Sequence, residues 1–72
     1  MEAIAYEFQK GNNEIVRATI SNFKGGKRAD LRVYFLNKNG EWTPTKKGVS
    51  IHLDLLKELK KAVVKLEELS KA

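Results

Sequence analysis

Cationic and aromatic side chains crowd into one segment of the chain, Asn22–Phe35. Its basic residues are Lys24, Lys27, Arg28 and Arg32, and its aromatic residues are Phe23, Tyr34 and Phe35. Ammonium and guanidinium groups neutralise phosphates, and aromatic faces stack on unpaired bases. The segment therefore predicts a surface that binds single-stranded nucleic acid, and it does not resemble an active site.

The positive charge is concentrated in the first two thirds of the chain. The 72 residues include 14 Lys and Arg against 9 Asp and Glu, which gives a net charge of +5. Residues 10–48 hold most of this excess, with Glu14, Asp30 and Glu41 as their only acidic residues. Residues 49–72 are close to neutral, because lysines and carboxylates nearly balance there. This asymmetry favours a polyanion as the partner of the first part of the chain.

Residue types that carry catalysis or hold metals are scarce. The chain has no cysteine and one histidine, His52, and its acidic residues lack companions at the spacing of a metal or acid–base site. We expect no catalytic residue, metal, cofactor or small-molecule substrate, and hence no enzyme. No apolar run is long enough to span a bilayer and no targeting segment is evident, so we also expect a soluble protein without a membrane partner.

These side chains must be positioned by a small α+β domain that covers residues 1–72. Alternation of apolar and polar residues predicts strands at about 4–10, 15–22, 29–37 and 41–51, separated by turns rich in Gly and Asn. The period then changes to that of an amphipathic helix at about 53–70. Four consecutive strands and a terminal helix predict an antiparallel sheet with one helix beside it.

The predicted helix is apolar over more of its surface than one contact with the sheet requires. Its main apolar stripe comprises Leu55, Leu59, Ala62, Leu66 and Leu69. A second copy of the helix is one way to cover the excess, and so short a chain gains stability from a homodimer. The alternative is that the chain's own curved sheet covers the helix. The lysines of the helix, Lys57, Lys60, Lys61 and Lys65, are expected on its solvated face.

Several short motifs occur in the order and spacing of a known family. They are Phe23-Lys24-Gly25, the Asp30-x-Arg32-x-Tyr34-Phe35 pattern, Gly40-Glu41, and Pro44 followed by Lys46-Lys47-Gly48-Val49-Ser50. With them the chain resembles the single-stranded-DNA-binding domain of the positive cofactor 4 family of transcriptional coactivators, in a prokaryotic or phage form. The resemblance runs from about Phe8 to Leu59. It implies a homodimer of strongly curved four-stranded sheets, each followed by a helix, that binds single-stranded or melted DNA.

The resemblance also implies which residues contact nucleic acid. The family's contacts correspond to Phe23, Lys24, Arg32, Phe35, Lys46 and Lys47. Gly26 stands where family members have a lysine, so we assign that phosphate contact to Lys27 and Arg28. Phe35 stands where the family has Trp, and we expect Trp42 to compensate for the smaller stacking face.

Two ambiguities remain within this set of residues. Arg32 can also pair with Asp30, and Phe23 and Phe35 can be core residues instead of stacking platforms. Arg32 and Phe35 are three residues apart, so a regular strand directs them to opposite faces. Contact of both with one nucleic acid requires a bulge or sharp bend near Val33-Tyr34.

The sequence thus predicts a basic DNA-binding protein with little sequence preference. Its expected role is transcription regulation as a coactivator, or replication and repair, with the transcription machinery as a further partner. In a prokaryote we expect the protein in the cytoplasm, associated with the nucleoid. In a eukaryote we expect it in the nucleus. The alternatives are an RNA-binding protein and a protein-interaction module that docks an acidic transcription partner.

Overall fold

A computed structural model describes residues 2–23 and 26–71, without the side chains of Glu2 and Phe23. Four strands follow one another along the chain, β1 (Glu2–Gly11), β2 (Glu14–Phe23), β3 (Gly26–Leu36) and β4 (Trp42–His52). A 3-10 turn, η1 (Leu53–Leu55), leads into the helix α1 (Leu56–Ser70). The predicted α+β architecture is confirmed, and the helix begins three residues later than expected because the 3-10 turn precedes it.

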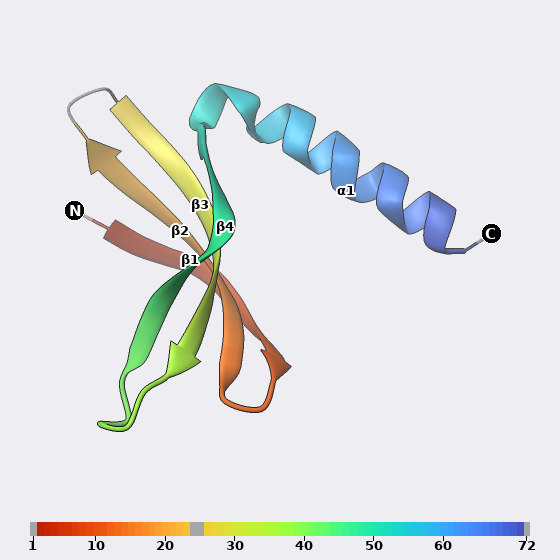
Figure 1. Cartoon of the computed structure of the whole chain (residues 1–72). Coiled ribbons are helices and arrows are strands. Elements are labelled where there is room, and N and C mark those ends of the chain that lie inside the picture. The colour runs from red at the N-terminus through yellow and green to blue at the C-terminus, as the bar shows by residue number, and fades with distance from the viewer. Residues whose placement is uncertain (1, 24–25, 72) are drawn as a thin grey trace.

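The four strands form one open antiparallel sheet in the order β1-β2-β3-β4. Figure 1 shows the sheet strongly twisted, with its strands crossing near their middles and α1 extending away to one side. Short turns join the strands. Asn13 adopts the left-handed conformation (φ 58°) in the first turn, and Gly40 adopts it (φ 77°) in the third, where glycine avoids the clash that a side chain would bring.

The pairing of β2 with β3 is regular along its whole length, from Glu14 opposite Phe35 to Phe23 opposite Gly26. Partners in such a pair point to the same side of the sheet, and side chains alternate along each strand. One side, which we call the arginine face, carries Ile15, Arg17, Thr19, Arg28, Asp30, Arg32 and Tyr34. The other, which we call the apolar face, carries Val16, Ala18, Ile20, Ala29, Leu31, Val33 and Phe35.

The buried core of the described residues is small and lies on the arginine face. Ile15 and Tyr34 are each 7% exposed, and Thr19, farther along β2 on the same face, is also buried. Tyr34 stands directly opposite Ile15, so these two side chains cover each other. No described residue of α1 is buried.

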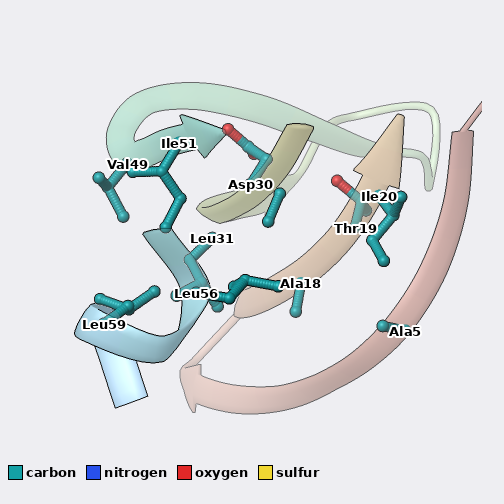
Figure 2. Close-up of a pocket in the computed structure, with 11 residues that line it drawn as sticks. Ala5, Ala18, Thr19, Ile20, Asp30, Leu31, Val49, Ile51, Leu56 and Leu59 are labelled. Carbon is teal, nitrogen blue, oxygen red and sulfur yellow. The ribbon is translucent and has the colours of Figure 1, made fainter. Parts of the chain in front are cut away.

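The first turn of α1 lies against the apolar face of the sheet. Leu56 and Leu59 line a small apolar cavity together with Ala18, Leu31 and Val49 (Figure 2). Beyond this point α1 leaves the sheet, and Leu66 and Leu69 are exposed. A single chain therefore leaves most of the helix's apolar stripe uncovered.

Candidate nucleic-acid interface

The most irregular part of the sheet is a bulge in β4, and it carries the predicted Lys46-Lys47 pair. Arg32 pairs with Gly48 and Tyr34 pairs with Pro44, so residues 45–47 of β4 stand opposite Val33 alone. Extra residues in one strand bend it and redirect its side chains. Lys46 and Lys47 are both exposed there. We call residues 45–47 the lysine bulge.

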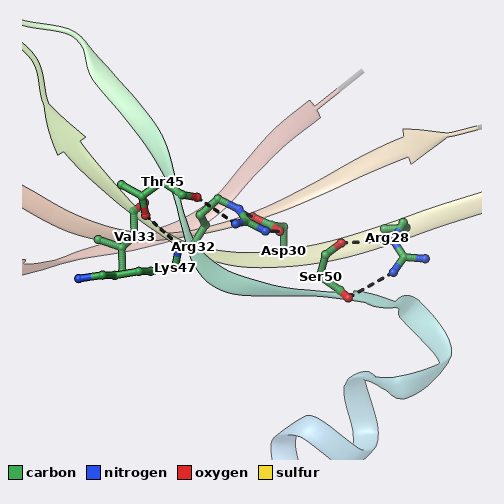
Figure 3. A network of polar contacts seen from close by, with 7 residues as sticks. All are labelled: Arg28, Asp30, Arg32, Val33, Thr45, Lys47 and Ser50. Atoms are coloured by element: carbon green, nitrogen blue, oxygen red, sulfur yellow. Dashed lines mark hydrogen bonds and ion pairs between the residues drawn. The ribbon is translucent and has the colours of Figure 1, made fainter.

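Two hydrogen bonds fix the lysine bulge to β3, and a third lies within the bulge itself (Figure 3). The Thr45 hydroxyl donates to the Val33 carbonyl at 2.8 Å, and the same oxygen accepts from the Lys47 backbone N–H at 3.1 Å. The Arg32 guanidinium donates from Nη1 to the Thr45 carbonyl at 3.0 Å. The backbone that carries the two lysines is therefore held in place before any ligand arrives.

Arg32 is held in turn by Asp30, two residues before it on the arginine face. Nη2 donates to Oδ1 of Asp30 at 2.7 Å and Nε donates to Oδ2 at 3.0 Å, the fork geometry typical of a strong Arg–carboxylate pair. Hydrogen bonding to Asp30 raises the pKa of Arg32, against a smaller opposing effect of desolvation. Three of the five donors of Arg32 are thus used inside the protein. The predicted pairing with Asp30 is present. Contact of Arg32 with DNA stays a prediction, and its two remaining N–H donors are available for it.

Arg28 and Lys27 lie at the start of β3, beside the second turn. Arg28 donates from Nε to the Ser50 hydroxyl and from Nη2 to the Ser50 carbonyl, both at 3.2 Å (Figure 3). These bonds extend the Arg28 side chain along β4. Lys27 is exposed and pairs with Asn22 of β2. Both cations remain available to phosphates as predicted contacts, and Lys24 and the Phe23 side chain lie outside the described residues.

Arg17 is a basic residue that the sequence did not single out. Its guanidinium lies 4.5 Å from the centre of the Tyr34 ring, a cation–π contact, and Nε donates to Glu7 at 2.8 Å. The alternation of β2 predicts that Arg17 lies on the polar side of this strand. The pairing register that brings it next to Tyr34 cannot be predicted from the sequence. Tyr34 is a core residue, and Arg17 covers it.

The two described candidates for base stacking lie at the end of the sheet near the third turn. Phe35 is 41% exposed on the apolar face, opposite Thr43, and Trp42 is 37% exposed opposite Leu36. Each offers an accessible ring. Trp42 points to the same side as its partner Leu36, and Leu36 is the neighbour of Phe35 along β3. Neighbouring residues of a strand point to opposite sides, so the two rings lie on opposite sides of the sheet.

The position of the bulge bears on whether Arg32 and Phe35 can contact one ligand. Contact of both with one ligand requires a bulge or sharp bend of β3 near Val33-Tyr34. A register shift between β3 and β4 lies at this position, but β3 pairs with β2 without any shift. The irregularity lies in the opposite strand, β4. Arg32 and Phe35 therefore point to opposite faces. A nucleic acid that contacts both residues of one chain must cross an edge of the sheet.

Two further kinds of feature are absent from the described part of the chain. Residues 2–23 and 26–71 contain no group of three or more His, Cys, Asp or Glu side chains that could hold a metal ion. Nor does a helix in these residues have the length and hydrophobicity to cross a membrane.

Comparison with solved structures identifies the fold. A PC4 homologue from Burkholderia pseudomallei, in a tetragonal crystal form, superposes with a TM-score of 0.85 at 21% identity, covering 93% of this chain and 98% of that one. A bacteriophage T5 homologue of the eukaryotic transcription coactivator PC4, implicated in recombination-dependent DNA replication, superposes with a TM-score of 0.71 at 30% identity, covering 99% of this chain and 80% of that one.

Sequence comparison gives the same answer. None of the curated proteins matches the chain. Residues 8–62 match the family described as Transcriptional Coactivator p15 (PC4), and this match covers most of the chain, including the whole of β2, β3 and β4. The predicted resemblance is confirmed, and the chain belongs to the Transcriptional Coactivator p15 (PC4) family.

Proposed function

We propose that this protein is a homodimeric, non-catalytic binder of single-stranded DNA with little sequence preference. The lysine bulge is the observation that carries the proposal. Two lysines stand on a backbone that Thr45 and Arg32 fix to β3, and exposed Trp42 and Phe35 lie a few residues away. Cations carried on a fixed backbone, with accessible aromatic rings at the same end of the sheet, suit a strand whose phosphates and bases are both exposed.

The two kinds of side chain bind different parts of the strand. Lys46 and Lys47, with Lys27 and Arg28 at the other end of β3, neutralise phosphates and release counterions. Phe35 and Trp42 stack on unpaired bases, and the predicted contacts at Phe23 and Lys24 extend the surface into the second turn. Neither interaction reads the identity of a base, which accounts for weak sequence preference.

The homodimer is supported by what one chain leaves exposed. Leu55, Leu66 and Leu69 are at least half exposed, and the described core of the sheet is small. A chain of this size gains the buried area it lacks from a second copy. A two-fold dimer also brings together two sheets, so a strand that leaves one chain can continue on the other.

The biological role follows from the family and its relatives. Membership of a transcriptional coactivator family supports a role at melted DNA in transcription, with the transcription machinery as a further partner. The T5 relative supports a role in replication and repair. Because the similar solved structures are bacterial and viral, we propose that the protein acts at the nucleoid, in the cytoplasm of a prokaryotic cell.

Fluorescence anisotropy over a series of salt concentrations tests the proposal. Single-stranded, bubble and duplex oligonucleotides of equal length are titrated, together with an RNA of matched sequence. We expect tighter binding to single-stranded and bubble DNA than to duplex. The salt dependence is the slope of the logarithm of the binding constant against the logarithm of the salt concentration. Replacing Lys46 with Gln should reduce the size of this slope by about 0.7, the value for one phosphate on a single strand. Lys10→Gln is the matched control, because Lys10 pairs with Glu14 away from the bulge.

Equal affinity for single-stranded and duplex DNA would overturn the single-strand proposal. Stronger binding of the RNA would indicate an RNA-binding protein. Binding of an acidic protein partner that survives both salt and competing oligonucleotide would indicate an interaction module.

A further inference from the structure

The helix α1 carries a second basic surface that the proposed interface does not use. Lys57, Lys60, Lys61 and Lys65 surround Val64 and line a shallow hollow with it. All four lysines are exposed. We call this surface the lysine face. It begins in the first turn of α1 and continues along the part of the helix that extends away from the sheet (Figure 1).

The lysine face lies on the side of α1 away from the apolar stripe. At 3.6 residues per turn, Lys57, Lys61 and Val64 fall on one side of the helix, whereas Leu59 and Leu66 fall on the other. A second copy that covers the leucines therefore leaves the lysines facing outward. The two surfaces of the helix do not compete for the same partner.

The lysine face carries positive charge that its neighbours neutralise only in part. Lys61 lies 3.3 Å from Glu58 and Lys65 lies 3.5 Å from Glu68. Within residues 2–23 and 26–71, Lys57 and Lys60 form no ion pair. Exposed pairs of this kind contribute little to stability, so a polyanion can replace the carboxylates at small cost.

The chemistry of the lysine face indicates duplex DNA as the partner. No aromatic residue other than His52 occurs after Trp42 in the sequence, so this surface has no platform for unpaired bases. Its lysines can contact only phosphates. Duplex DNA presents about one negative charge per 1.7 Å of its axis, more than a single strand does. From Lys57 to Lys65 the helix rises about 12 Å, enough to meet several phosphates along one groove edge.

We propose that the lysine face binds the phosphate backbone of duplex DNA flanking the single strand held by the sheet. The inference rests on the proposed function, since the sheet supplies the single-strand contact. The protein would then bind a junction between single-stranded and duplex DNA more tightly than either part alone. Binding at the helix is independent of sequence and more sensitive to salt than stacking is.

Three fluorescent DNAs test the proposal: a single-stranded tail, a blunt hairpin duplex, and the same hairpin carrying the tail. The variant Lys57→Gln/Lys60→Gln removes two charges and keeps good helix formers at both positions. Lys10→Gln/Lys38→Gln is the control, because it removes the same charge from positions away from α1. Circular dichroism checks that each variant is folded.

We expect the wild-type protein and the control to bind the tailed hairpin severalfold more tightly than the tail. In the helix variant this advantage should disappear, while affinity for the tail alone is unchanged. The salt dependence for the tailed hairpin should fall by up to about 1.8, or about 0.9 for each phosphate that is no longer neutralised. An equal weakening on the tail and the tailed hairpin would overturn the proposal, as would an equal weakening in the control.

The two proposals fail in different ways. If the wild-type protein does not bind the tail, the single-strand function is wrong, and the blunt hairpin still tests the lysine face. If it binds the tail but gains nothing from the attached duplex, the lysine face proposal alone is wrong.

Discussion

Arg32 reaches across the sheet and donates a hydrogen bond to the Thr45 carbonyl at 3.0 Å, at the first residue of the lysine bulge. The same guanidinium is held by Asp30 through two further hydrogen bonds. Asp30 and Arg32 therefore help to position Lys46 and Lys47. Arg32, which is predicted to contact DNA, therefore also has a structural role in this chain.

Replacing Asp30 with Asn tests this positioning role. Arg32 would lose its carboxylate partner, and a hydrogen bond to a charged group contributes about 1.5–3 kcal/mol. We expect a lower free energy of unfolding in urea and weaker binding of single-stranded DNA, because the bulge is less firmly held. Glu7→Gln is the control, since it breaks the Arg17 ion pair, whose two side chains form no described hydrogen bond to the lysine bulge. Equal losses of DNA affinity in the two variants would argue against a specific role for Asp30.

The Asp30–Arg32 pair should also be insensitive to pH in the neutral and mildly alkaline range. Hydrogen bonding to Asp30 raises the pKa of Arg32 above its already high ordinary value. The stability that this shift contributes is fully present below the ordinary arginine pKa and is lost only as pH rises through the raised one. The stability difference between wild type and Asp30→Asn should therefore stay constant from about pH 7 to pH 9. Urea titrations across that range measure it, and a difference that falls within the range would contradict the assignment.

Gly48 lets β4 return to β3 directly after the lysine bulge. A Cβ at this position would lie 2.6 Å from the Leu31 carbonyl oxygen and 2.9 Å from the Arg32 Cα, both of them backbone atoms that cannot easily move. Gly48→Ala should destabilise the protein by about 1–3 kcal/mol, the usual cost of overpacking. Gly11→Ala is the control, because its nearest contact would be an ordinary 3.7 Å. Equal thermal stability of the two variants would show that β4 adapts at no cost.

The order of elements was predictable because it depends on local patterns. The change of period near Leu53 marks the helix, and the turns at Gly11–Asn13 and Asn37–Gly40 separate strands whose alternation is clear. Consecutive strands joined by short turns then pair as neighbours, so the sheet order follows. The extra residues of β4 were not predictable, since Thr45, Lys46 and Lys47 are all polar and have no alternation from which a change of register can be recognised.

The candidate site was less predictable than the fold because it depends on register. Sequence spacing showed that Arg32 and Phe35 conflict in a regular strand, but it did not show which strand is irregular. The contact between Arg17 and Tyr34 joins residues far apart in the sequence, and only the pairing of β2 with β3 brings them together. The asymmetry of the helix was visible in its spacing, whereas the exposure of both of its sides depends on how α1 leaves the sheet.

Phe35→Ala should weaken binding of single-stranded DNA. Stacking of one base contributes about 1–3 kcal/mol, and the Phe35 ring is accessible on the apolar face. Phe35→Leu separates stacking from burial, because leucine retains apolar bulk and has no aromatic face. Anisotropy at fixed salt should show weaker binding in both variants, and a salt series should show an unchanged salt dependence. Full affinity in Phe35→Leu would instead assign Phe35 to the packing of the apolar face.

Leu66→Glu should disrupt the proposed homodimer. Leu66 is 65% exposed in a single chain, on the apolar stripe of α1, and a dimer that covers it cannot accept an unpaired carboxylate there. Light scattering should give twice the chain mass of 8.2 kDa for the wild-type protein and a lower mass for the variant. Val64→Glu is a matched control, because Val64 is an exposed apolar residue of the same helix on the lysine face. Its mass should remain that of the dimer, so a lower mass in both variants would indicate damage to the helix itself, and a monomeric wild-type protein would refute the dimer.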